Sequence, residues 1–159
     1  MLPNPLINGY PYNWHESIFK FDALSCTGMT NVSGIKVKVE QAPQFAVSRY
    51  AFNIATGKQE IDPITTTMYV FAWAPIKAML MTKSLGRGIA LASFSFSAIA
   101  AGNPLEGAPP VGDVFAGCKI TEVGREYGQD VNGFKIDVTF QPLRHRDIDG
   151  VSLISELGS

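Results

Sequence analysis

Residues 41 to 64 read Gln41-Ala-Pro-Gln-Phe-Ala-Val-Ser-Arg-Tyr-Ala-Phe-Asn-Ile-Ala-Thr-Gly-Lys-Gln-Glu-Ile-Asp-Pro-Ile64, and they separate two strand-like runs. The stretch has no sustained period of its own, so we expect a long loop. Irregular connections longer than about 12–15 residues are uncommon in compact domains and are usually functional or disordered. This one is too apolar for a solvated linker. It therefore needs a surface to lie on, either in its own chain or in a neighbour.

The segment before this loop gives the clearest strand signal. From Ile35 to Glu40, apolar and charged residues alternate without a break, as in a strand with one buried and one solvated face. Other runs alternate or are rich in β-branched and aromatic residues, which favours strands. The expected strands are 17–21, 32–40, 65–73, 89–101, 114–123 and 134–140, with a possible last strand at 151–154.

One helix is expected among these strands. Pro75 stands at a plausible first helical position, and Gly86 supplies a stop, so we predict a short helix over about 75–85. Strands and helices do not alternate as they would in a parallel sheet. The sequence therefore predicts a mainly β fold, an antiparallel β-sandwich or barrel of about six to seven strands with this helix packed against it.

Composition narrows the classes of function. A chain of 159 residues predicts a single domain over 1–159. Charged residues make up 17% of it, against about 25% in an average protein, as expected if other protein covers much of the surface. A net charge of −1 without a basic block argues against binding nucleic acid through a basic face. No apolar run is long enough for a membrane span.

Motifs for chemistry are missing from the sequence. It contains no Gly-x-Ser-x-Gly string and no phosphate-binding loop, and Asp147-Ile-Asp149-Gly150 lacks the later ligands of a calcium loop. With no secretion signal, Cys26 and Cys118 are expected to be free thiols in the core. We therefore predict no catalytic residue, metal or cofactor. Two alternatives stay open: a small-molecule-binding β-barrel, and an enzyme that uses Cys26 or His15.

Several segments, taken in order, resemble one family. Ile7-Asn-Gly-Tyr-Pro-Tyr-Asn-Trp-His-Glu-Ser-Ile18 resembles the opening of bacteriophage tail tube proteins. Phe21-Asp-Ala-Leu-Ser-Cys-Thr-Gly28 is similar to the family's short turn before the strand that ends at Glu40. The long loop, the helix and a last hairpin from Gly133 to Leu143 follow in the family's order. The resemblance spans nearly the whole chain and extends to type VI secretion and pyocin-type tube proteins.

The resemblance implies a structural virion protein without enzymatic activity. Such a protein forms hexameric rings that stack into the inner tube of a phage tail, which we expect to be contractile, and the tube is a conduit for genome delivery. The implied partners are further copies of the chain and the tail sheath, baseplate and tape-measure proteins. DNA would pass through the lumen without sequence-specific binding, and the tail would assemble in the host cytoplasm.

The resemblance also assigns two contact regions. In the family, the loop after the second strand reaches a neighbouring ring, so residues 41–64 become the inter-subunit stacking loop. Its expected contact residues are Phe45, Arg49, Tyr50, Phe52, Lys58, Glu60 and Asp62. The Pro- and aromatic-rich N-terminal arm, residues 1–14, is expected to add contacts through Tyr10, Tyr12 and Trp14.

Overall fold

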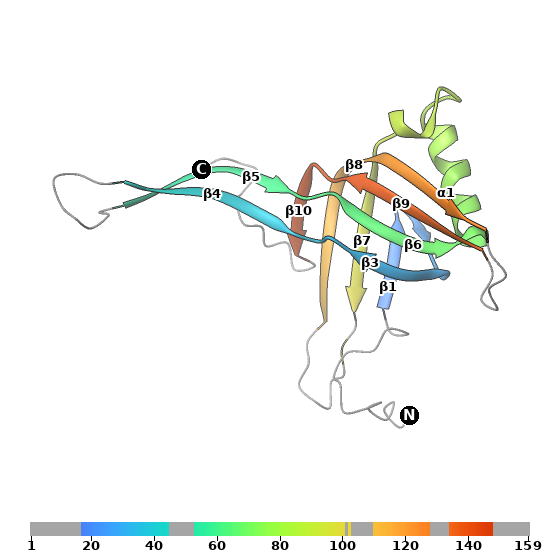
Figure 1. Cartoon of the computed structure of the whole chain (residues 1–159), viewed down its shortest axis with the longest axis horizontal. Coiled ribbons are helices and arrows are strands. Elements are labelled where there is room, and N and C mark those ends of the chain that lie inside the picture. The colour runs from blue at the N-terminus through green and yellow to red at the C-terminus, as the bar shows by residue number, and fades with distance from the viewer. Residues whose placement is uncertain (1–16, 45–52, 101, 103–109, 128–133, 148–159) are drawn as a thin grey trace.

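The structure, a computed structural model of the chain, describes residues 17–44, 53–100, 102, 110–127 and 134–147. Its body is a β-sandwich whose two layers run across each other (Figure 1). Every strand pairing is antiparallel. One layer holds β1 (Ser17–Phe21), β2 (Leu24–Ser25), β7 (Phe94–Ala100), β10 (Arg144–Asp147) and the first part of β8 (Val111–Glu126). The other holds the rest of β8, β9 (Lys135–Gln141), β6 (Ile64–Tyr69) and β3 (Met29–Ser33).

Strand β8 joins the two layers. Residues 111–118 pair with β7, and residues 119–126 pair with β9. The pairing with β7 shifts register between Phe115 and Cys118, where Gly117 has a φ of +68°. A bulge with a left-handed glycine bends a strand and increases its twist, and strands that turn in this way form the corners of crossed sandwiches. A Cβ at Gly117 would also lie 2.9 Å from Leu143 Cβ.

Aromatic side chains fill the space between the layers. Phe140 on β9 lies with its ring centroid 5.0 Å from that of Phe96 and 5.3 Å from that of Phe94. Phe21 on β1 contacts the same group, so strands from both layers meet in one cluster. The fully buried large side chains are Phe21, Phe96, Phe115, Phe140, Ile64, Met68, Ile76, Leu80, Ile136 and Val138. The predicted mainly β, antiparallel fold with one helix is thereby confirmed.

Helix α1 (Val70–Lys83) begins directly at the end of β6. The prediction of a strand through residue 73 and of a helix start at Pro75 is wrong, because Pro75 lies inside the helix. Four side chains on one face, Ala72, Trp73, Ile76 and Leu80, are buried in the core, and this burial outweighs the hydrogen bond that Pro75 cannot donate. At the start of the helix, the Val70 N–H donates to Phe134 O over 3.2 Å.

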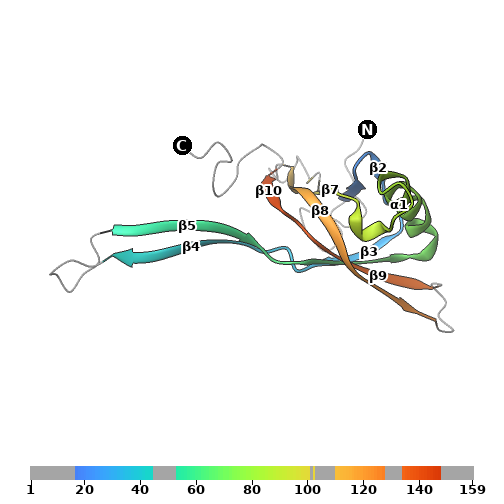
Figure 2. The same cartoon turned by 90° about the horizontal axis from the view of Figure 1, so that it is seen from above.

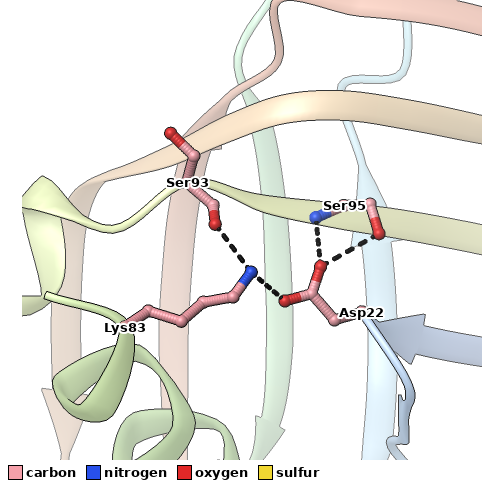
Figure 3. A network of polar contacts seen from close by, with 4 residues as sticks. All are labelled: Asp22, Lys83, Ser93 and Ser95. Atoms are coloured by element: carbon pink, nitrogen blue, oxygen red, sulfur yellow. Dashed lines mark hydrogen bonds and ion pairs between the residues drawn. The ribbon is translucent and has the colours of Figure 1, made fainter.

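A polar network holds the other end of α1 against the sheet (Figure 3). Lys83 Nζ donates to an Asp22 carboxylate oxygen and, over 2.9 Å, to Ser93 O. The second Asp22 oxygen accepts from the Ser95 N–H over 2.8 Å and from the Ser95 hydroxyl. Partial burial would raise the pKa of Asp22, but the hydrogen bonds and the Lys83 charge outweigh it and hold the pKa below its usual value. Asp22 is therefore a carboxylate that joins helix, turn and strand.

Two further predictions of strands need correction, and one strand was missed. The predicted strand 32–40 is split, since β3 ends at Ser33 and the next strand is β4 (Val37–Gln44). The run 89–101 is a strand only from Phe94 onward, since Ile89–Leu91 forms a 3-10 turn. The four-residue strand β10 was not predicted, because its charged sequence Arg144-His-Arg-Asp147 has no strand composition. The possible last strand at 151–154 and the arm 1–14 lie outside the described residues. None of the helices within the described residues has the length and apolarity to cross a membrane.

Candidate assembly surface

The described residues on both sides of 45–52 do not form an irregular loop. β4 (Val37–Gln44) and β5 (Asn53–Ile61) make an antiparallel hairpin that projects from the body (Figures 1 and 2). The register runs from Val37 opposite Ile61 to Gln44 opposite Asn53, with one irregularity after Val39. The prediction of a loop failed because the alternation that runs from Ile35 to Glu40 stops at Gln41, although strand β4 continues to Gln44. Pro43 fits a ribbon with free edges.

The base of the hairpin is attached to the body. Ile61 is buried in the core, and its carbonyl accepts a hydrogen bond from Gln141 Nε2 over 2.7 Å. Lys38 Nζ lies 3.6 Å from Asp62 Oδ1, and both side chains are partly exposed. Beyond the base the pattern changes, because residues 40–44 are all exposed. The hairpin thus has an anchored root and an outer part that pairs only with itself among the described residues.

The structure places some of the predicted contact residues. Asp62 is at the root and is paired with Lys38. Glu60 is exposed on β5, opposite Lys38 in the strand register. Lys58 belongs to the outer part of β5. Phe45, Arg49, Tyr50 and Phe52, and the arm residues Tyr10, Tyr12 and Trp14, lie outside the described residues. The predicted contact region therefore has two parts, a charge pair at the root and the outer part of the hairpin beyond it.

A second surface feature, which the sequence reasoning missed, is a groove of about 370 Å³ beside helix α1. One wall is α1, with Val70, Ala78 and Met81, and the other is formed by the ends of β8 and β9. There the exposed rings of Tyr127 and Phe134 meet edge to face, with centroids 5.4 Å apart. The signal that could have found it is an aromatic residue on each side of the polar β8–β9 connection.

Three side chains that could bind a metal, two on β10 and one on β8, also lie close together. Asp113, His145 and Asp147 bring oxygen and nitrogen atoms within 4.8 Å of one another. His145 Nε2 is 2.7 Å from Asp113 Oδ1, and its ring packs on Phe115 with centroids 4.9 Å apart. A metal on Nε2 would require a proton on the buried Nδ1, which has no hydrogen-bond partner among the described residues. A hydrogen bond from Nε2–H to Asp113 that fastens β10 to β8 accounts for the geometry without a metal.

Neither cysteine is placed for nucleophilic chemistry. Cys26 and Cys118 are free and buried, as predicted. Burial raises the pKa of the Cys26 thiol and raises the pKa of Cys118 to about 12. Both thiols are therefore protonated at neutral pH, whereas nucleophilic attack needs the thiolate. His15, the other residue of the predicted enzyme alternative, lies outside the described residues.

The packing of the sandwich core is also relevant to the alternative prediction of a small-molecule-binding β-barrel. A ligand-binding barrel keeps a cavity inside, whereas in the described part of this chain the space between the layers is filled by the phenylalanine cluster. The groove beside α1 lies outside that core. Two surface features of the described residues are thus candidates for contacts with other proteins: the projecting hairpin and the apolar groove.

Solved structures of tube components share this fold. An anti-feeding prophage cap, the AFP tube terminating cap, aligns with a TM-score of 0.62 at 13% identity over 91% of this chain and 95% of that chain. The sheath/tube terminator of PVC, an extracellular contractile injection system, gives 0.60 at 14% identity over 89% and 99%. The SPP1 tail tube gives 0.55 at 13% identity over 93% of each chain. No protein-family model and no curated protein matches the sequence. The predicted likeness to tail tube proteins is confirmed at the level of the fold.

Proposed function

We propose that this chain is a structural tube protein of a phage tail or a related contractile injection system. Copies form hexameric rings, and the rings stack into a hollow conduit. The fold supports this proposal, since tube and tube-terminator proteins match it over about nine-tenths of both chains. The chain acts without catalysis, as a wall around cargo that passes through the lumen, and sheath, baseplate and tape-measure proteins are its partners in the tail.

One observation on this chain carries the proposal, namely the hairpin that leaves the body. An isolated two-stranded ribbon is marginally stable in water, and β4 and β5 pair with each other rather than with the eight-stranded sheet. The residues between them, 45–52, include Phe45, Tyr50 and Phe52. A long ribbon with aromatic residues at its far end gains stability by lying on another protein surface. A neighbouring ring supplies that surface in every copy.

Electron microscopy of the purified full chain tests the proposal. We expect rings or tubes about 80–100 Å wide, the width of six domains about 30 Å across around a channel. Size-exclusion chromatography over a range of concentrations gives a second readout, since head-to-tail contacts assemble by mass action. A chain that stays monomeric at high concentration, with no rings on the grid, would contradict the proposal.

A further inference from the structure

We propose that the groove between α1 and the β8–β9 end binds residues 148–159 of a second copy of this chain. The site is distinct from the hairpin and would form a second contact between copies. Its walls present apolar side chains to solvent: Val70 is 42% exposed, Phe134 50% and Tyr127 71%. Large apolar side chains left in water at one place favour a partner that covers them.

The charges at the groove select the partner's chemistry. Lys77 on α1, Arg125 on β8 and Lys135 on β9 line it, and Glu126 is the one acidic residue in the lining. Lys135 Nζ lies 5.9 Å from the centroid of the Tyr69 ring, beside the start of α1. The lining therefore carries three positive charges and one negative charge. An apolar segment with acidic flanks complements it, because opposite charges at the edge of an interface steer binding.

Residues 148–159 match this description better than the hairpin connection 45–52 or the β8–β9 connection 128–133. They include five apolar residues, Ile148, Val151, Leu153, Ile154 and Leu157, two acidic residues, Asp149 and Glu156, and no basic residue. The apolar run 151–154 stands between the two acids. Residues 45–52 are apolar but carry Arg49 and no acid, and the β8–β9 connection, 128–133, has Val131 as its single apolar residue. Charge and apolar content together therefore favour 148–159.

Strand β8 separates Asp147, the last described residue before this segment, from the groove of its own chain. The segment follows Asp147, which pairs with Asp113 near the first end of β8, whereas Arg125 and Glu126 in the groove lie at the last end. The 12 steps from position 113 to position 125 correspond to at most about 40 Å along β8. Twelve extended residues span at most about 43 Å. Little of the segment would remain to lie in its own groove, so the occupant comes from another copy.

Peptide binding tests the proposal without requiring rings. The probe is a fluorescent peptide of residues 148–159, and the receptor is the full chain with Leu153→Asp and Ile154→Asp, whose own segment no longer competes. We expect saturable binding by fluorescence anisotropy. Adding Ala78→Glu, which places a charge in the groove, weakens it about tenfold or more. Ala90→Glu, at an exposed alanine outside the groove lining, is the matched control. Absence of peptide binding, or equal effects of the two glutamates, would overturn the proposal.

A charge exchange tests the complementarity. Reversing Lys77 and Lys135 to Glu in the receptor should weaken binding of the natural peptide about fivefold, because exposed pairs contribute little each. A peptide with Asp149→Lys and Glu156→Lys should regain that affinity on the reversed receptor and bind the original receptor more weakly. Loss of binding for both peptides on the reversed receptor would overturn the charge assignment.

A crosslink between copies decides whether the contact is intermolecular. Chains with Ala78→Cys are mixed with chains that carry Leu153→Cys under mild oxidation, and the native cysteines are buried. We expect a disulfide-linked pair that needs both variants in the mixture, and none when Ala90→Cys replaces Ala78→Cys. The proposal rests on self-association but fails separately from the tube: tubes without crosslink or peptide binding would overturn only the groove contact, and peptide binding without tubes only the proposed function.

Discussion

The body and the hairpin of this chain differ in how far their own chain covers their residues. In the body, strands of both layers bury their apolar side chains in one aromatic cluster. In the hairpin, two strands of eight and nine residues pair with each other, and residues 40–44 are exposed. The first arrangement is complete within one chain, whereas the second leaves apolar sequence at a distance from the core. The proposed function assigns folding to the body and assembly to the hairpin.

The sharpest test of this contrast is a cavity in the body. Phe140 is fully buried and lies within 6.0 Å, between ring centroids, of Phe21, Phe94 and Phe96. Phe140→Ala should lower the free energy of unfolding by about 3–5 kcal/mol, because a large buried ring leaves a cavity. Urea titration followed by circular dichroism measures the change.

The matched control is Phe71→Ala on the exposed side of α1. Phe71 is 68% exposed, and its ring stacks on Tyr69 with centroids 5.8 Å apart. We expect a loss below about 1 kcal/mol, the range for surface positions and exposed ring pairs. Equal losses at the two phenylalanines would mean that the aromatic cluster is not the centre of stability.

Removing the outer hairpin should have the opposite effects: it should hardly change stability but should prevent assembly. Gln41 pairs with Thr56, so residues 42–55 can be replaced by Asn-Gly, which closes two-residue hairpin turns. The free energy of unfolding should change by less than about 1 kcal/mol, because the root at Ile61 and Gln141 is kept. Ring stacking should be lost. Negative-stain microscopy gives the readout, and tubes as long as those of the intact chain would remove the hairpin from the assembly contacts.

The same contrast explains which features the sequence could predict. Strands 17–21 and 134–140 were predicted nearly to the residue, because alternation reports a face that is buried in the chain's own core. The hairpin was missed because alternation marks only the first half of β4 and stops at Gln41. In that run alternation does not report a core face, since Ile35 is exposed. The helix start was displaced to Pro75 because Tyr69-Val-Phe-Ala-Trp73 has strand composition, whereas the burial of Trp73 and Ile76 beneath α1 decides the structure.

The candidate surfaces were predictable to different degrees. The segment 41–64 was singled out by its length and apolar content, but its secondary structure was not predicted. Its role as a contact region stays a prediction. The groove was not found, because its walls come from α1 and from the ends of β8 and β9, which are distant in sequence. Likewise, no local pattern brings Asp22 to Lys83, which is 61 positions further along the chain. Features made by tertiary packing need the fold before they can be recognised.

The Asp22 network tests how firmly α1 belongs to the body. Asn tolerates the left-handed backbone that Asp22 adopts, with a φ of 54°, so Asp22→Asn removes the charge while keeping the turn. We expect a loss of about 1 kcal/mol at pH 7, since the partners are partly exposed. Because the folded-state pKa is lowered, the stabilisation is complete above the unfolded pKa of about 4 and disappears as pH falls through the folded pKa.

The measurement is urea unfolding of both chains between pH 7 and pH 2. The difference between the original chain and Asp22→Asn should be constant down to about pH 4 and shrink below it. Lys20→Gln, which removes an exposed charge on β1, serves as the control for general charge effects. A difference that grows as the pH falls has the wrong sign for a carboxylate stabilised in its ionised form, and it would exclude this role for Asp22.

The smallest expected effects come from two single charge reversals, one at each end of the hairpin region. Lys36 is exposed before β4, and its carbonyl accepts from the Asp62 N–H over 3.0 Å, so its side chain is not needed for that contact. Arg49 lies in the segment between β4 and β5. Each change to Glu should alter the free energy of unfolding by less than about 0.5 kcal/mol.

If the outer hairpin contacts a neighbouring subunit, the two charge reversals should affect assembly differently. Arg49→Glu should raise the protein concentration needed for tubes by up to about fivefold, the range for one exposed ion pair, and added salt should reduce that effect. Lys36→Glu should leave it nearly unchanged, because its position adjoins the body. Light scattering against concentration measures both. Equal shifts would mean that net charge, rather than a contact of the outer hairpin, controls assembly, and the division between a folding body and an assembling hairpin would then lose its electrostatic support.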